Sequence, residues 1–233
     1  MEKKLLKDYN DMEKGAYLGA ISSIATADHS ASDEEIEYIM AVADSADLSP
    51  EQKQAVRRAA TELTGQELKK CLDILKASDL KYSLVTDLIS FAESDKKYSE
   101  EEKANVEKIS QYLGINEHQF NLLDQFVKKT AETQPEPEEI HKPSFLSNLG
   151  LEQKFKNSGI NISSLTKGLL GIAAPIILAN LMRGRQGRGM GSSLNPFNMS
   201  GSSGGGLGSI ISMLNRGRGF SSTGNMFNRV LGA

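Results

Sequence analysis

Apolar residues in the first 133 positions recur at intervals of three and four, without the alternation that is typical of β-strands. Glycine and proline are scarce in this part of the chain. The pattern predicts an all-α fold, a compact bundle of about seven short helices joined by tight connections. The helices are expected near residues 3–28, 33–46, 50–63, 66–77, 79–94, 100–113 and 117–132.

Several of these helices begin with a recognisable capping signal. In a capping box, a hydroxyl side chain accepts a hydrogen bond from an early helix amide, and an acid or amide side chain three residues later returns the bond. Pro50 stands where a first helical residue is expected, a position at which its missing N–H costs nothing. The boxes are Ser32–Glu35, Ser49–Gln52, Thr64–Glu67 and Ser99–Glu102, with a looser version at Asn116–Gln119.

The chain also contains an internal repeat with an offset of 67 residues. The segment "ATADHSASDEE", which begins at Ala25, is matched by "AESDKKYSEEE", which begins at Ala92. With Asp28 superposed on Asp95, apolar positions pair on both sides of the motif and through the following helix. The repeat therefore predicts two pseudo-equivalent halves that share one core.

Charge and glycine content divide the chain into two regions of different composition. Residues 1–143 hold 29 acidic against 18 basic side chains, whereas residues 144–233 hold one acid against nine Lys and Arg. Of the 21 glycines, 17 follow Pro143. We therefore expect a helical domain over residues 1–133, a Pro/Glu linker over 134–143, and a largely flexible, Gly-rich basic tail with short apolar segments over 144–233.

The doubled acidic motif has a structural interpretation and a chemical one. Capping serines and first-turn acids complement the positive end of a helix dipole, which accounts for most of the motif. An aspartate at the end of the preceding helix faces the negative end, which is unfavourable unless something compensates. A lysine, a loop amide or water would compensate, and so would a bound calcium or magnesium ion. The candidate metal ligands are Asp28, Glu35, Asp95 and Glu102.

An EF-hand is excluded, because Ile39 occupies the twelfth place of a loop that would begin at Asp28. The segments "IATADHSASDEEIEYI" and "FAESDKKYSEEEKANV" resemble instead the doubled motif of the tellurite-resistance TerB-like family, over roughly residues 10–130. The resemblance implies a helical bundle with acidic patches, a divalent-ion site and work in membrane-linked stress-response assemblies. It implies no enzymatic activity. The sequence departs from the family where His29 and Lys96 replace a frequent glycine.

The residues themselves give no signal for an enzyme. The three histidines, at positions 29, 118 and 141, lack neighbours at metal-ligand spacing, and the chain has no nucleophile elbow or phosphate-binding loop. The single cysteine, Cys71, lies on a helical apolar stripe and is expected in the core. No segment at the start of the sequence has the apolar length of a signal peptide, so a cytoplasmic location is expected.

The tail combines an uncharged apolar run, residues 168–182, with arginine–glycine clusters. Before it, residues 144–159 have the pattern of a short amphipathic helix. The run is short for a membrane span, so self-association, packing in an assembly and peripheral contact with anionic membranes stay open. The residues expected to interact are Leu169, Leu170, Ile172, Ile176, Ile177, Leu181, Arg183, Arg185 and Arg188.

Together these features predict a non-enzymatic adaptor or scaffold with protein partners, itself included, in a stress-response complex. The alternative function is nucleic-acid binding through the Arg-Gly clusters, because arginines can meet phosphates and stack on bases. Only three phenylalanines follow residue 190, which makes the tail poor in stacking side chains.

Overall fold

The computed structural model describes residues 6–25, 33–61, 65–94, 100–133, 139 and 142–169. Within these ranges the chain forms ten helices and no strand, which confirms the predicted all-α fold. The helices are α1 (Asp11–Ala25), α2 (Asp33–Ser45), α3 (Pro50–Thr61), α4 (Gly65–Leu75), α5 (Leu80–Ser94), α6 (Glu100–Tyr112), α7 (Glu117–Thr133), α8 (Pro143–Asn148), α9 (Glu152–Ser158) and α10 (Ile162–Gly168).

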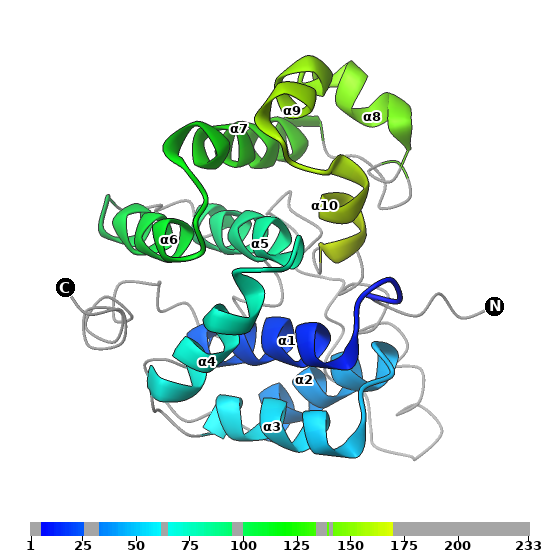
Figure 1. Ribbon diagram of the computed structural model, residues 1–233, viewed down its shortest axis with the longest axis vertical. Coiled ribbons are helices and arrows are strands. Elements are labelled where there is room, and N and C mark those ends of the chain that lie inside the picture. Colours follow the sequence, from blue (N-terminus) through cyan, green and yellow to red (C-terminus); the bar gives the residue numbers. More distant parts are fainter. Residues whose placement is uncertain are drawn as a thin grey trace, which may run out of the picture.

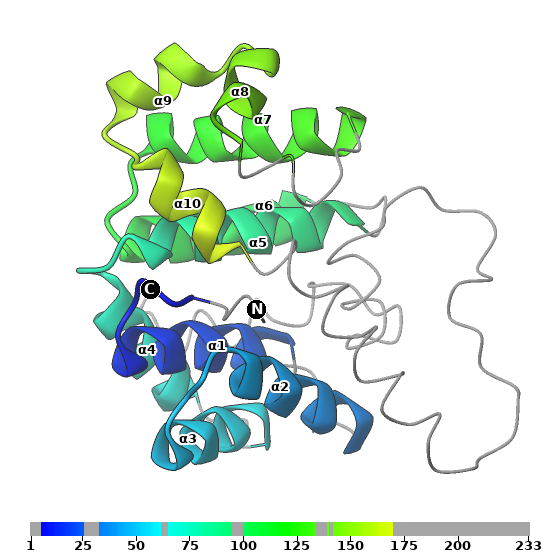
Figure 2. The same cartoon turned by 90° about the vertical axis from the view of Figure 1, so that its right-hand side faces the viewer.

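The helices form two groups stacked on one another (Figures 1 and 2). In the first group, α1 packs against α2, α3 and α4; in the second, α5 packs against α6, α7 and α10. Direct contact between α1 and α5 joins the groups. Each of these two helices therefore lies at the centre of one group, as a repeat of two halves with a shared core predicts.

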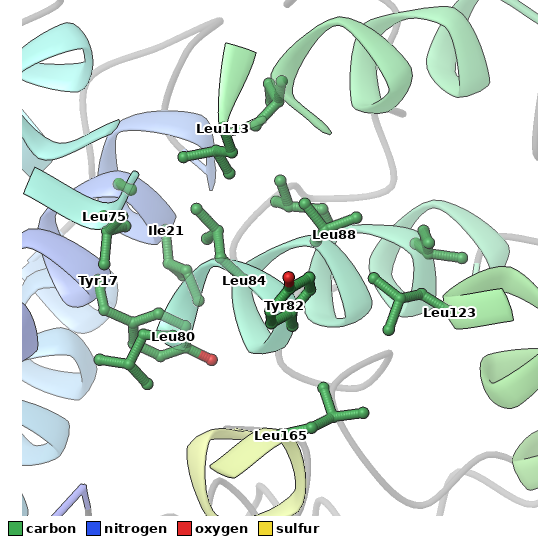
Figure 3. Packing of buried hydrophobic residues seen from close by; sticks show 14 of the residues in the cluster. Tyr17, Ile21, Leu75, Leu80, Tyr82, Leu84, Leu88, Leu113, Leu123 and Leu165 are labelled. Atoms are coloured by element: carbon green, nitrogen blue, oxygen red, sulfur yellow. The ribbon is translucent and has the colours of Figure 1, made fainter. Parts of the chain in front are cut away.

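One continuous core runs through both groups (Figure 3). Ile21 of α1 and Leu84 and Leu88 of α5 are buried members of this core. The hydroxyl of Tyr17 donates a hydrogen bond to the buried carboxylate of Asp87, so a polar contact between the halves is enclosed in the apolar core. Burial of leucine and isoleucine side chains of this kind stabilises a fold by about 1.5–3 kcal/mol each.

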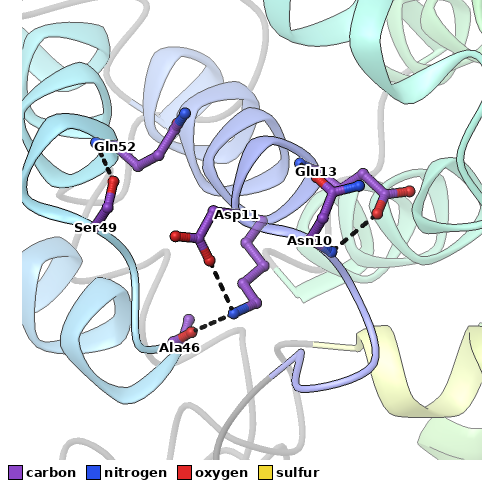
Figure 4. A network of polar contacts seen from close by, with 7 residues as sticks. Asn10, Asp11, Glu13, Ala46, Ser49 and Gln52 are labelled. Carbon is purple, nitrogen blue, oxygen red and sulfur yellow. Dashed lines mark hydrogen bonds and ion pairs between the residues drawn. The ribbon is translucent and has the colours of Figure 1, made fainter.

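The first helix begins later than expected, at Asp11 instead of near residue 3. A capping box that the sequence analysis did not identify sets this start. Asn10 Oδ1 accepts from the Glu13 amide at 2.9 Å, and Glu13 Oε2 accepts from the Asn10 amide at 3.1 Å (Figure 4). These reciprocal bonds satisfy two amides at the N-terminal end, which fixes the helix start there.

The buried side chain of Lys14 joins the start of α1 to the end of α2 through its contacts with Asp11 and Ala46, the two partners labelled in Figure 4. Its Nζ donates to the Ala46 carbonyl at 3.0 Å and lies 3.3 Å from Asp11 Oδ1. A cation beside the last carbonyls of a helix is favoured by the helix dipole, and the aspartate balances its charge. The contact therefore holds the first helix against the second.

The folded body extends further along the chain than the sequence analysis placed it. A flexible tail was expected from residue 144, with one short amphipathic helix at its start, but the structure has three short helices between Pro143 and Gly168. Gly150 and Gly159 adopt left-handed backbone conformations, with φ of 67° and 76°, just after α8 and α9. These glycines end the helices and let the chain turn back onto the core. Residues 170–233 lie outside the described residues.

Candidate functional site

Each copy of the doubled motif lies within a set of three consecutive helices, α1–α3 or α5–α7, called a frame here. The two frames repeat in register. Helices α2 and α6 begin at Asp33 and Glu100, and α3 and α7 begin at Pro50 and Glu117, each pair separated by the 67-residue offset of the sequence repeat. The agreement confirms that the repeat is structural. The same local geometry therefore surrounds both copies of the motif on the side that the structure describes.

The ends of α2 and α6 show how closely the frames agree. Asp47 and Gly114 both take a left-handed backbone conformation, with φ of 55° and 75°. In the first copy the Leu48 amide donates to the Ala43 carbonyl at 3.2 Å, and in the second the Ile115 amide donates to the Ser110 carbonyl at 3.0 Å. These six-residue bonds are the Schellman ending of a helix, formed at the same place in both halves.

The next helices are capped at equivalent positions as well. The Gln52 amide donates to Ser49 Oγ at 3.3 Å, and the Gln119 amide donates to Asn116 Oδ1 at 2.9 Å. The Asn116 amide donates the return bond to Gln119 Oε1 at 3.1 Å, which completes a capping box. Two of the predicted caps are thereby confirmed, while Ser32, Thr64 and Ser99 lie outside the described residues.

The structure places the backbone of two candidate metal ligands. Glu35 and Glu102 are the third residues of α2 and α6, in the first turn, although their side chains lie outside the description. Asp28 and Asp95 fall in the connections from α1 to α2 and from α5 to α6, which are not described. Among the side chains that are described, no group of three or more His, Cys, Asp or Glu is arranged to hold a metal ion.

A polar cluster that the sequence analysis missed adjoins the second motif. Lys128 Nζ lies 2.7 Å from Asp124 Oδ2 and 3.7 Å from Glu93 Oε1. Burial, and then the neighbouring Asp124, raise the pKa of the Glu93 carboxyl. Asp124 Oδ1 is buried and has no hydrogen-bond partner among the residues that the structure describes. The i,i+4 spacing of Asp124 and Lys128 is visible in the sequence, but their meeting with Glu93 requires the packing of α5 on α7.

The corresponding position in the first half has the opposite charge. One repeat length before Asp124 the chain has Arg57, an exposed residue of α3. The two frames are therefore alike in backbone and different in electrostatics beside the motif. The lysine of the second half already balances one of its two carboxylates, so this cluster is not by itself a vacant cation site.

The remaining expected functional residues are found in varied settings. Cys71 packs against the core, as predicted, and burial raises the pKa of its thiol to about 12, which leaves it protonated and unreactive at neutral pH. Leu169, the first of the expected interaction residues, packs against the protein's own core. The other eight interaction residues lie beyond the described ranges.

The surface of the described body offers few apolar side chains to a partner. Met12 is the one large hydrophobic residue exposed in the part of the chain that the structure covers. The helices found there also include none that is long and apolar enough to cross a membrane.

Comparison with known proteins gives one result. Residues 14–125 match the family model described as tellurite resistance protein TerB. No curated protein and no solved structure matches the chain. The matched segment starts in α1, covers both copies of the motif and ends within α7, so it leaves α8–α10 and the tail outside. Residues 14–125 of this chain are therefore a TerB-like domain, in agreement with the resemblance seen in its doubled acidic motif.

Proposed function

We propose that the protein is a non-enzymatic adaptor of the TerB-like type. In this proposal its two Asp–Glu pairs bind divalent cations, and its C-terminal tail associates with itself or attaches the domain to a larger assembly or membrane in a stress response. The observation that carries the proposal is the register of the repeat, which places Glu35 and Glu102 at the same position of two equivalent helix starts.

The chemistry of the motif supports the cation. Each copy brings an aspartate that follows a central helix close in sequence to a glutamate in the first turn of the next helix. Hard ions such as calcium and magnesium prefer carboxylate oxygens. Capping alone would explain the serines and the first-turn acids, but it gives no reason for an aspartate in the connection before each of these helices. A cation bound between the aspartate and the glutamate would explain the aspartate in both copies of the motif.

Titration with calcium or magnesium tests this part of the proposal. Binding to the folded state is expected to raise the melting temperature, with a gain of about 2.7 kcal/mol when the free ion is at one hundred times its dissociation constant. Replacing both Asp28 and Asp95 with asparagine should abolish the gain. The matched control replaces Asp33 and Glu100, which are exposed first-turn acids, with asparagine and glutamine and should retain it. Equal melting temperatures with and without millimolar ion would leave the motif only a capping role.

The tail supports the adaptor role. Six arginines and no acid follow Leu169, in a segment that also contains the apolar run through Met182. Such a run needs a partner surface, because a soluble monomer rarely exposes a contiguous apolar patch. The described body, whose exposed large hydrophobic residues amount to Met12, offers no second place for apolar association within the ranges covered.

Substitution of Ile176 and Ile177 by aspartate tests the tail. The double variant should scatter light as a smaller particle than the parent chain, and it should lose any binding to anionic liposomes. The arginines should add a salt-sensitive part to either association. Replacing Ser202 and Ser203 by aspartate is the matched control, because it adds the same charge to a polar part of the tail. A parent chain that stays monomeric and ignores liposomes would refute this role, and salt-dependent binding to RNA would favour the nucleic-acid alternative.

A further inference from the structure

Residues 142–169, called the arm here, dock on a surface formed by α5, α7 and the N-terminal residues 6–10. Phe145 and Phe155 of the arm are buried and meet the ring of Phe126 edge-on, with centroid distances of 6.3 and 5.9 Å. Leu165 of α10 is fully enclosed beside α5 (Figure 3). Apolar anchors therefore secure the arm along its whole length.

The polar contacts of the docking surface are made to the backbone of the arm. Four side chains of the body donate hydrogen bonds to main-chain carbonyls of the arm, and two of these, at the ends of α8 and α9, are groups that a short helix leaves without an internal partner. The bonds run from Lys129 to Leu149 O at 2.5 Å, Gln119 to Ser158 O at 3.0 Å, Tyr9 to Ser164 O at 3.1 Å and Ser83 to Leu165 O at 3.0 Å. The surface thus recognises three consecutive helices by their backbone.

The arm depends on this surface for its structure. Its helices contain six, seven and seven residues, far fewer than an isolated helix needs in water. Gly168 lies so close to α5 that a Cβ there would come within 2.2 Å of Ser83 Oγ and 2.8 Å of Ser83 Cβ. At the same end, Lys167 Nζ lies 2.8 Å from Asp8 Oδ2. The arm therefore binds the rest of the same chain through a closely packed interface.

The docking surface and the arm have different relations to the TerB-like domain. Ser83 and Gln119 lie inside the matched residues 14–125, whereas the whole arm follows them. Nine residues, 134–142, connect the end of α7 to the start of α8, and they include Pro135 and Pro137. Proline stiffens an extended connection, and a short, stiff connection between a body and its docked element favours exchange of that element between copies.

We propose that the arm of one copy docks on the α5–α7 surface of a second copy, so that two chains exchange arms. Exchange replaces each contact of the arm with an identical contact between chains and requires no new surface. Through a short connection the chain's own arm competes at an effective concentration of the order of millimolar. The inference rests on the proposed function, because association through the tail raises the local concentration to the range in which exchange competes.

Crosslinking of the full chain tests the exchange. One preparation carries Asp8→Cys and another carries Lys167→Cys, both at exposed positions, and the two are mixed, incubated and treated with a short bismaleimide. Because Asp8 and Lys167 meet only across the docked arm, a covalent dimer is expected from the mixture. The native Cys71 is partly buried, and with the pKa of its thiol raised to about 12 it reacts little with a maleimide at neutral pH. Energy transfer between dyes on the same two cysteines gives a second readout that needs no covalent closure.

Two controls define the outcomes. A chain with both substitutions should crosslink within itself where its own arm is docked and form covalent dimers where arms are exchanged. Lys167→Cys mixed with Arg57→Cys, on the exposed face of α3, should give no dimer. Association in light scattering without dimer or energy transfer between Asp8→Cys and Lys167→Cys would overturn the exchange and leave the tail proposal intact. If Ile176→Asp with Ile177→Asp leaves the particle size unchanged, the tail proposal fails instead. The mixture is then run at millimolar protein, where absence of dimer again overturns the exchange.

Discussion

The two halves of the molecule share one arrangement of three helices, and the fourth helix of each half comes from a different part of the chain. In the first half, α1 packs against α3 and α4, which both belong to the TerB-like segment. In the second, α5 packs against α7 and against α10, which reaches the core from beyond that segment. A repeated frame therefore fixes the positions of three helices, while the fourth helix, the remaining partner of the central helix, can come from elsewhere in the chain.

Equivalent positions show how the same residue type serves both arrangements. In the first half the side chain of Gln52 covers Gly15, where an added Cβ would come within 2.0 Å of its Oε1. One repeat later these positions hold Gln119 and Tyr82. There the side-chain nitrogen of Gln119, Nε2, lies 3.4 Å from the Tyr82 hydroxyl and donates to the Ser158 carbonyl of the arm. The larger Tyr82 redirects the glutamine from its own half towards the arm.

Close helix contact is also obtained in different ways. In the first half the central helix supplies the small residue, because a Cβ at Gly19 would lie 2.9 Å from the Cys71 sulfur of α4. In the second half the outer helix supplies it, as Gly168 of α10 approaches Ser83 of α5. The arm is thus fitted as closely to its central helix as α4 is to α1.

The largest expected effect is the loss of an arm anchor. Phe155→Ala should lower the free energy of unfolding by about 3–5 kcal/mol, because it empties a fully buried aromatic site and removes an edge-on contact with Phe126. Urea denaturation followed by circular dichroism measures the change. Gln153→Ala, on the exposed face of the same helix, is the control and should change the stability by no more than about 0.5 kcal/mol. Equal, small effects of the two substitutions would show that the second half does not need the arm.

An intermediate effect is expected where tyrosine–aspartate pairs join the halves. Tyr17 of α1 bonds to Asp87 of α5 inside the core, and Tyr112 of α6 bonds to Asp73 of α4 at the surface, at 2.5 Å. Tyr17→Phe should cost about 1–3 kcal/mol, because it removes a donor from a buried acceptor. Tyr112→Phe should cost no more than about 0.5 kcal/mol, because water replaces the hydroxyl. A larger loss at Tyr112 would mean that the surface contact, and not the core, holds the halves together.

The surface pair also has a signature in pH. The hydrogen bond from Tyr112, and then that from Lys69, hold the pKa of the Asp73 carboxyl below its usual value. A lowered folded-state pKa stabilises the protein above the unfolded-state value, and the contribution disappears as the pH falls through the folded-state value. Tyr112→Phe should therefore reduce the loss of stability on acidification, measured as the difference between melting temperatures at neutral and acidic pH.

Much of this architecture could be predicted because its signals are local. The starts of α2, α3, α6 and α7 were predicted to the residue, since capping side chains and apolar spacing agree there. The start of α1 was placed too early, because its box begins with Asn10 and an asparagine cap resembles ordinary polar sequence. The arm was assigned to the tail, although Gly150, Gly159 and the capping Asn161 mark its helix ends, because its composition merges with the Gly-rich sequence beyond.

The candidate site was predictable only in part, for a related reason. The first-turn positions of Glu35 and Glu102 follow from the caps, and these are local. The contact of Glu93 with Lys128 depends on how α5 packs on α7, and no spacing in the sequence encodes it. The opposite charges of Arg57 and Asp124 were visible as residues, but their significance appears only when the frames are superposed in space.

A small effect is expected at the left-handed residue that ends α2 and α6. Asp47 holds this conformation in the first half and Gly114 holds it in the second, where nothing lies within 4 Å of an added Cβ. Gly114→Ala therefore meets no neighbour and should cost only its backbone strain, about 1 kcal/mol, or roughly 2–4 °C in melting temperature for a chain of this size. Gly114→Asn should cost less, because asparagine enters the left-handed region more readily than alanine. If alanine were tolerated as well as asparagine, the left-handed residue would not be what sets the shared register of the two halves.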